Sequence, residues 1–166
     1  MNKSLAEMFH YNAWANQTLF SALRDLTPQQ LDTHVPGASG SLREVILHIV
    51  GAQQTFILRT VGRQHEGELH RNSPWPGMQQ LLDLLDSTDR RLIEIAQHLD
   101  DKQEVDLPYQ GVSYRFPTRF FLVHALTHSV EHRTELKFAL AHLGIDTPDL
   151  DAWHYATAAG YGQPAP

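Results

Sequence analysis

Three histidines spaced four residues apart constrain this chain more than any other feature of its sequence. His124, His128 and His132 lie in the stretch PTRFFLVHALTHSVEHRTELKFALAHLG, residues 117–144. Residues four apart on an α-helix lie one turn above each other on the same face, so the three would form a column. At about 100° per residue, the face of His128 also carries apolar residues and one glutamate: Phe121, Glu135 and Ala139. The histidines therefore point inward, where an unpaired polar group costs about 1–3 kcal/mol.

A metal ion would partner such histidines, and it requires a second helix. Two histidines four apart on a helix can converge on one ion. His124 and His132 are about 12 Å apart along the helix axis, so the column can supply only two ligands. His48 lies in the middle of SLREVILHIVGAQQTFILRTVG, residues 41–62, and is the other central histidine of a long predicted helix. The pattern predicts a metal site between the two helices; the alternative is a core His48 bonded to a carbonyl group or to water.

Hydrophobic periodicity predicts four long helices, at 4–26, 41–61, 78–99 and 118–143. Ser4 with Glu7, and Ser41 with Glu44, have the spacing of capping boxes at two of the helix starts. Three shorter elements complete the chain: a helical turn at 28–31, a small hairpin or an extended loop within VDLPYQGVSYRF (105–116), and a short helix within 149–159, with a frayed tail from about 160. We expect an all-α four-helix bundle forming a single domain over residues 1–166.

Charge and cysteine content exclude several classes of function. The net charge is −6 and no basic stripe is visible, which argues against a nucleic-acid partner. The chain has no cysteine, so it contains no disulfide, thiolate ligand or cysteine nucleophile. It also shows no signal-peptide core, and no apolar run approaches the roughly 20 residues of a membrane span. We expect a cytoplasmic protein with no membrane partner.

The residues around the column leave two further interpretations open. His128, Glu131 and His132 spell the H-x-x-E-H motif of inverted zinc peptidases, but no glutamate follows Glu135 to complete that site. Glu131 and Glu135 are equal candidates for orienting an imidazole from behind, and solvated surface carboxylates are the alternative for both.

The sequence resembles the DinB-like, damage-inducible metalloprotein superfamily over nearly its whole length. The stretch FHYNAWANQTLFSAL (9–23) resembles the first-helix signature of that family, and residues 41–62 resemble its second helix with a single metal histidine. VHALTHSVEHRTELKFALAHLG (123–144) resembles its last helix, although Thr134-Glu135 replace the usual Gly-Gln pair. The resemblance implies an up-down-down-up bundle. It also implies one divalent ion held by His48, His128 and His132, with His124 one turn away.

What is known of this family implies a function for the site. Characterised relatives include transferases and isomerases that use low-molecular-weight thiols on small-molecule substrates. Three neutral imidazoles leave an open position on the ion, which can lower the pKa of bound water toward about 7 or deprotonate a thiol. With no cysteine in the chain, the thiol would be a cosubstrate. Arg59 and Arg133 are candidates for holding it if it is anionic, and a salt bridge at the surface or between helices is the alternative for each. Zinc or nickel is the first expectation, with iron or copper next.

Two expectations complete the sequence-based interpretation. The alternative function is a non-catalytic metal-binding protein, structural or a stress-response sensor.

The apolar residues Val123, Leu126 and Val130 lie about 140–160° from the histidine column, and a helix apolar on two faces needs two partners. We therefore expect a homodimer, with cover by the helices of the same bundle as the alternative.

Overall fold

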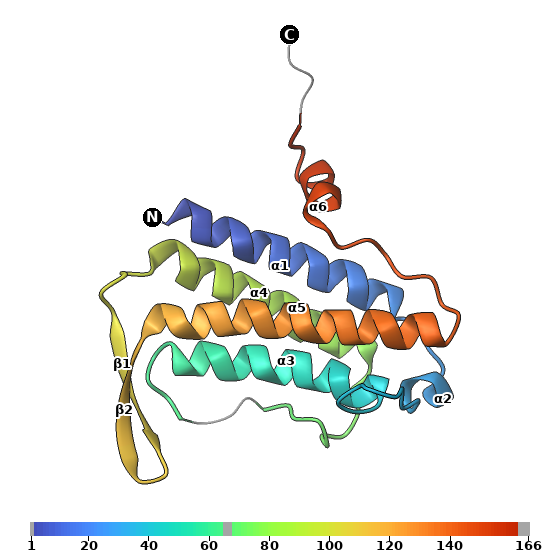
Figure 1. The fold of residues 1–166 in the computed structure, drawn as a ribbon, viewed down its shortest axis with the longest axis horizontal. Coiled ribbons are helices and arrows are strands. Elements are labelled where there is room, and N and C mark those ends of the chain that lie inside the picture. The colour runs from blue at the N-terminus through green and yellow to red at the C-terminus, as the bar shows by residue number, and fades with distance from the viewer. Residues whose placement is uncertain (1, 65–67, 163–166) are drawn as a thin grey trace.

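Four long helices run side by side in the computed structural model, which describes residues 2–64 and 68–162. They are α1 (Lys3–Ala22), α3 (Leu42–Arg59), α4 (Met78–His98) and α5 (Thr118–His142). Helices α1 and α5 run in one direction and α3 and α4 in the other (Figure 1), which is the up-down-down-up order. The predicted four-helix bundle is confirmed. No helix in the described part of the chain is long and apolar enough to cross a membrane.

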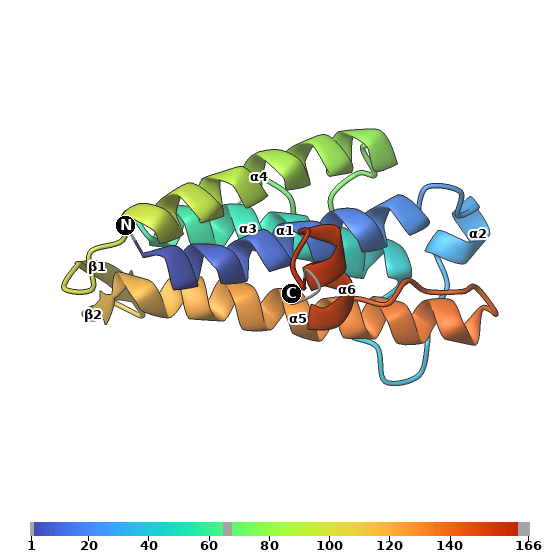
Figure 2. The same ribbon diagram turned by 90° about the horizontal axis from the view of Figure 1, so that it is seen from above.

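The packing partners of the helices place α3 beside α5. The most extensive helix contacts join α1 to α4 and α3 to α5. Seen from above, α4 and α5 lie on opposite sides of the bundle with α1 and α3 between them (Figure 2). The core is formed by side chains from all four helices, among them Leu19, Ile46, Leu85 and Leu136, each with essentially no exposed surface.

Capping residues determine where two of the helices begin. Ser41 Oγ accepts a hydrogen bond from Glu44 N and Glu44 Oε2 accepts one from Ser41 N, so the predicted capping box of α3 is confirmed. At the first helix the prediction was wrong, because Asn2 Oδ1 accepts from Leu5 N and thereby caps α1 ahead of Ser4. That helix also ends at Ala22, four residues earlier than expected. The helical turn predicted between α1 and α3 is present as α2 (Pro28–Leu31).

A two-stranded hairpin connects α4 to α5. Strand β1 (Glu104–Tyr109) pairs antiparallel with β2 (Val112–Pro117), and α5 begins at the next residue. The turn residues Gln110 and Gly111 both have positive φ, +50° and +80°. Two central residues with positive φ define the type I′ turn that suits the twist of a hairpin.

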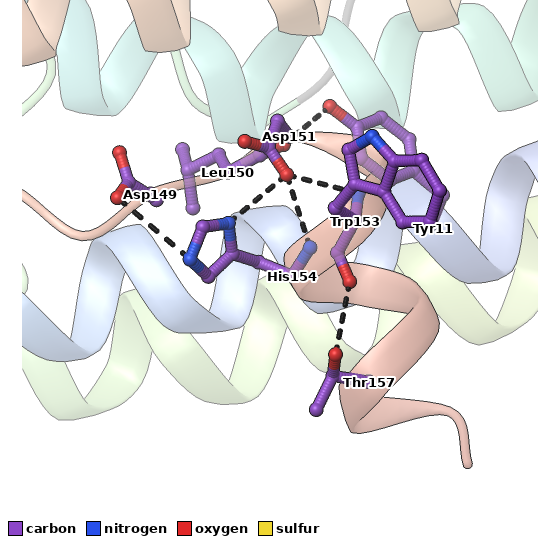
Figure 3. Close-up of polar contacts among 7 residues, drawn as sticks. All are labelled: Tyr11, Asp149, Leu150, Asp151, Trp153, His154 and Thr157. Atoms are coloured by element: carbon purple, nitrogen blue, oxygen red, sulfur yellow. Dashed lines mark hydrogen bonds and ion pairs between the residues drawn. The ribbon is translucent and has the colours of Figure 1, made fainter. Parts of the chain in front are cut away.

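The segment after α5 returns across α1 and ends in a short helix, α6 (Ala152–Ala158) (Figure 3). Tyr11 Oη donates a hydrogen bond to the carbonyl oxygen of Leu150, 2.8 Å away. Asp151 caps α6 and also contacts the ring of His154, whose other nitrogen lies 3.8 Å from Asp149. The predicted final helix is thus present, and it is shorter than the predicted range of 149–159. Residues 163–166 of the expected tail lie outside the described part.

Candidate metal centre

The interface between α3 and α5 brings together the three histidines that the sequence singled out. Their rings are 4.4–4.7 Å apart, centroid to centroid. His48 Nε2 lies 3.0 Å from His128 Nε2, and one ring nitrogen each of His48, His128 and His132 fall within 4.8 Å of one another. Within residues 2–64 and 68–162, this is the one cluster of three or more histidine and acidic side chains close enough to share an ion.

The donor set fits a divalent transition metal. Zinc–nitrogen bonds of about 2.0–2.1 Å place the nitrogens of a tetrahedral site about 3.3 Å apart, close to the 3.0 Å between His48 Nε2 and His128 Nε2. Burial lowers the pKa of His48 to about 4, with help from the charges of Arg71 and His132. Burial also lowers the pKa of His128 to about 3, reinforced by His132 and His48. Both rings are therefore neutral near pH 7, which is the form that coordinates metal.

Glu135 orients one of the three rings. Its Oε2 lies 2.6 Å from His132 Nδ1, which leaves Nε2 as the nitrogen of that ring that can coordinate an ion. The other oxygen of Glu135 accepts a hydrogen bond from the backbone N–H of Ser39. Burial alone would raise the pKa of Glu135, but these hydrogen bonds outweigh it and hold the pKa below its usual value. A carboxylate in this position fixes the tautomer of a metal-binding histidine and makes it a stronger ligand.

Glu131 and His124 lie outside the cluster. The Glu131 side chain is exposed, so of the two glutamates that the sequence left equal, only Glu135 contacts a ligand candidate. The exposed His124 packs its ring against Phe56 at 4.5 Å and against Phe120 at 5.9 Å. The end of the α3–α5 interface that faces the hairpin is therefore aromatic.

The other described histidines do not approach the cluster. All are exposed: His10, His34, His70, His98, His142 and His154. His65 lies outside the described residues.

A buried polar network that the sequence did not predict lies beside the histidine cluster. Arg133 Nη1 donates to Asn12 Oδ1 at 2.7 Å and to Asn16 Oδ1 at 2.6 Å. Asp89 accepts from Asn16 Nδ2 at 3.0 Å and from Gln53 Nε2 at 2.6 Å. These five side chains come from all four long helices and are all buried. Arg133 is thus held in the core, away from the surface position that binding an anionic cosubstrate would need.

A sequence signal for this network exists. Asn12 and Asn16 are four residues apart on a helix face that also carries Phe9 and Leu19, both of which are buried. Polar side chains on an apolar face require buried partners, which is the argument that identified the histidine column.

The comparisons with known proteins agree with this architecture. The model of the DinB family matches residues 1–165. A solved structure, a DinB-like protein from Bacillus cereus ATCC 10987, superposes with a TM-score of 0.67 at 18% identity, covering 90% of this chain and 99% of that one. At this identity the likeness concerns the fold alone. A search of curated proteins finds no match.

Proposed function

Because this chain belongs to the DinB family, we propose that it is a metal-dependent enzyme of the transferase, isomerase or hydrolase type. One divalent ion, held by His48, His128 and His132, would activate a low-molecular-weight thiol or a water molecule. The observation that carries the proposal is the convergence of three imidazole nitrogens within 4.8 Å. Three neutral ligands leave a tetrahedral ion one open position, which is typical of catalytic zinc sites.

The residues of the chain have separate tasks in this proposal. The ion, when bound, lowers the pKa of water or a thiol at its open position and so supplies a nucleophile near neutral pH. Glu135 accepts the Nδ1–H of His132, so that Nε2 of that ring carries the lone pair. The exposed aromatic side chain of Phe120 and the ring of His124 offer an apolar surface to a substrate on the hairpin side. Since the chain has no cysteine, an activated thiol must enter as a cosubstrate.

Zinc or nickel is the first expectation for the ion, and iron or copper the next, because imidazole suits all four. Elemental analysis of the purified protein identifies the metal and its stoichiometry. We expect His48→Ala, His128→Ala and His132→Ala to lose stoichiometric metal. His124→Ala is the matched control on the same helix and should keep it. Full metal content in His48→Ala would show that the third ligand is a different residue.

Turnover is tested separately from metal binding. The metal-loaded protein should transfer a common low-molecular-weight thiol to an electrophilic acceptor, and the His132→Ala variant should not. An exchangeable water on the ion supports the enzyme. A fourth protein ligand that closes the site would support the alternative, a structural or sensor protein without turnover.

A homodimer is part of the same proposal. Val123 and Val130 are 55% and 43% exposed on the outer face of α5, so the bundle itself leaves much of them uncovered. A second copy of the chain would bury this face. Light scattering at micromolar concentration should give twice the monomer mass, and a value near 18.8 kDa would contradict the dimer. A cytoplasmic location stays a prediction that rests on the sequence.

A further inference from the structure

The end of the α3–α5 interface opposite the aromatic side chains carries the guanidinium of Arg71. Ser39 lies there and links two side chains: its N–H donates to Glu135, and its carbonyl oxygen accepts from Arg71 Nη1 at 3.4 Å. Because Glu135 also contacts His132, these hydrogen bonds link Arg71 to the histidine cluster, although it is 23 residues from the nearest of the three in sequence.

The loop that carries Arg71 is anchored to α3. A Cβ atom at Gly51 would lie 1.9 Å from the carbonyl oxygen of Leu69, so the loop touches the helix backbone where only glycine fits. Leu69 N also donates to Gln54 Oε1 at 3.3 Å. This anchor is two residues before Arg71 and brings the guanidinium to the start of α3.

The guanidinium of Arg71 has unused hydrogen-bonding capacity. It is partly exposed, and no carboxylate in the described part of the chain lies within 4.0 Å of it. It lines a pocket of about 380 Å³ together with Asn72, Ser73 and Arg43. Arg43 already pairs with Asp32 at 2.7 Å, and Glu44, which also lines the pocket, is engaged in capping Ser41.

We propose that Arg71 binds the carboxylate of the small molecule that is activated at the histidine cluster. This inference rests on the proposed function and names its substrate class, a thiol or other metal-binding molecule that carries a carboxylate. A guanidinium presents a planar fork of N–H donors that matches a carboxylate with two parallel hydrogen bonds. The reactive atom would lie at the histidines and the carboxylate at Arg71. Arg71 is thus a positioning residue. It has the anion-binding role for which the sequence suggested Arg133.

The test uses the cobalt-substituted protein, whose absorption spectrum reports anions that reach the ion. Wild type is titrated with 3-mercaptopropionate and with its methyl ester, which lacks the charge. A charged hydrogen bond contributes about 1.5–3 kcal/mol, so the acid should bind at least about tenfold more tightly than the ester. Arg71→Gln should lose this preference while keeping its metal content and its affinity for the ester. Arg43→Gln is the matched control from the same pocket and should keep the preference.

A second pair of probes separates this inference from the proposed thiol chemistry. Malonate and monomethyl malonate contain no thiol, and malonate should also bind wild type more tightly than Arg71→Gln. If neither thiol perturbs the spectrum but the malonate preference depends on Arg71, thiol activation fails and the carboxylate site stands. Equal binding of acid and ester to wild type, no binding of any probe, or loss of metal in Arg71→Gln would each overturn the inference.

Discussion

At the scale of single residues, the clearest contrast is between Glu131 and Glu135. Both flank the histidine pair on α5, and the helical wheel places either within reach of an imidazole. The fold distinguishes them through a residue about 96 positions away, because the Ser39 N–H holds Glu135 against His132 while Glu131 faces outward. Of the two glutamates, only Glu135 contacts a histidine of the cluster.

Replacing Glu135 by glutamine should therefore weaken metal binding about 10- to 100-fold, the usual effect of losing a carboxylate behind a ligating histidine. The amide is neutral and can no longer hold the Nδ1–H of His132 with a charged acceptor. Competition with a chromogenic chelator measures the affinity. Glu131→Gln is the control and should match wild type; an equal loss in both variants would mean that the effect comes from net charge alone.

Sequence reasoning at this scale found the histidines but not all of their surroundings. His48, His128 and His132 were predictable because imidazoles on an apolar helix face need a partner, and the spacing limits which ones meet. The role of Arg71 was not predictable. It depends on a loop whose path follows from the close contact of Leu69 with Gly51, which no local pattern of the sequence contains.

At the scale of elements, local signals predicted most of the structure. Ser41 and Glu44 form the expected capping box, and the Gln110–Gly111 pair forms the turn of the expected hairpin. The start of α1 was mispredicted because Asn2 and Ser4 are both good capping residues, and a capping box alone does not choose between them. The backbone N–H of Asn2 donates to the carbonyl oxygen of Gln97 on α4, a tertiary contact that no local pattern contains.

The hairpin turn gives a prediction at this scale. Gly111→Ala should lower the free energy of unfolding by about 1 kcal/mol, since an alanine at a φ of +80° is strained. Gln110→Asn should instead raise it by a few tenths of a kcal/mol, because asparagine tolerates positive φ better than glutamine does. Urea unfolding of the two variants measures both changes. Destabilisation by Gln110→Asn would contradict the assigned turn.

At the scale of the whole molecule, two sets of buried groups respond to pH with opposite signs. Burial raises the pKa of Asp89 to about 6, so the folded state holds more protons there than the unfolded state between about pH 4 and 6. The contribution of Asp89 to stability is therefore greatest in acid and is lost as pH rises through about 6. His48 and His128 have lowered pKa values, so their contribution is present above about pH 6.5 and is lost as pH falls.

In metal-free protein, Asp89→Asn should make stability fall more steeply between pH 7 and pH 5. The substitution removes the group whose contribution to stability grows in acid. The contribution of the two histidines, which is lost in acid, then remains without a counterbalancing change. Urea unfolding at pH 7, 6 and 5 gives the slope of the free energy of unfolding against pH. Asp83→Asn changes an exposed carboxyl on the same helix and should leave the slope unaltered. An unchanged slope in Asp89→Asn would show that Asp89 has an ordinary pKa.

The histidine cluster joins two helices that are far apart along the chain, since His48 and His128 are 80 residues from each other. The segment between them contains α4 and the hairpin. With an ion held by both histidines, α3 cannot separate from α5 until a coordination bond breaks. Metal release then becomes a step in unfolding, and the lifetime of the folded state is set partly by the exchange kinetics of the ion. A chain of modest equilibrium stability could persist for as long as the ion stays bound.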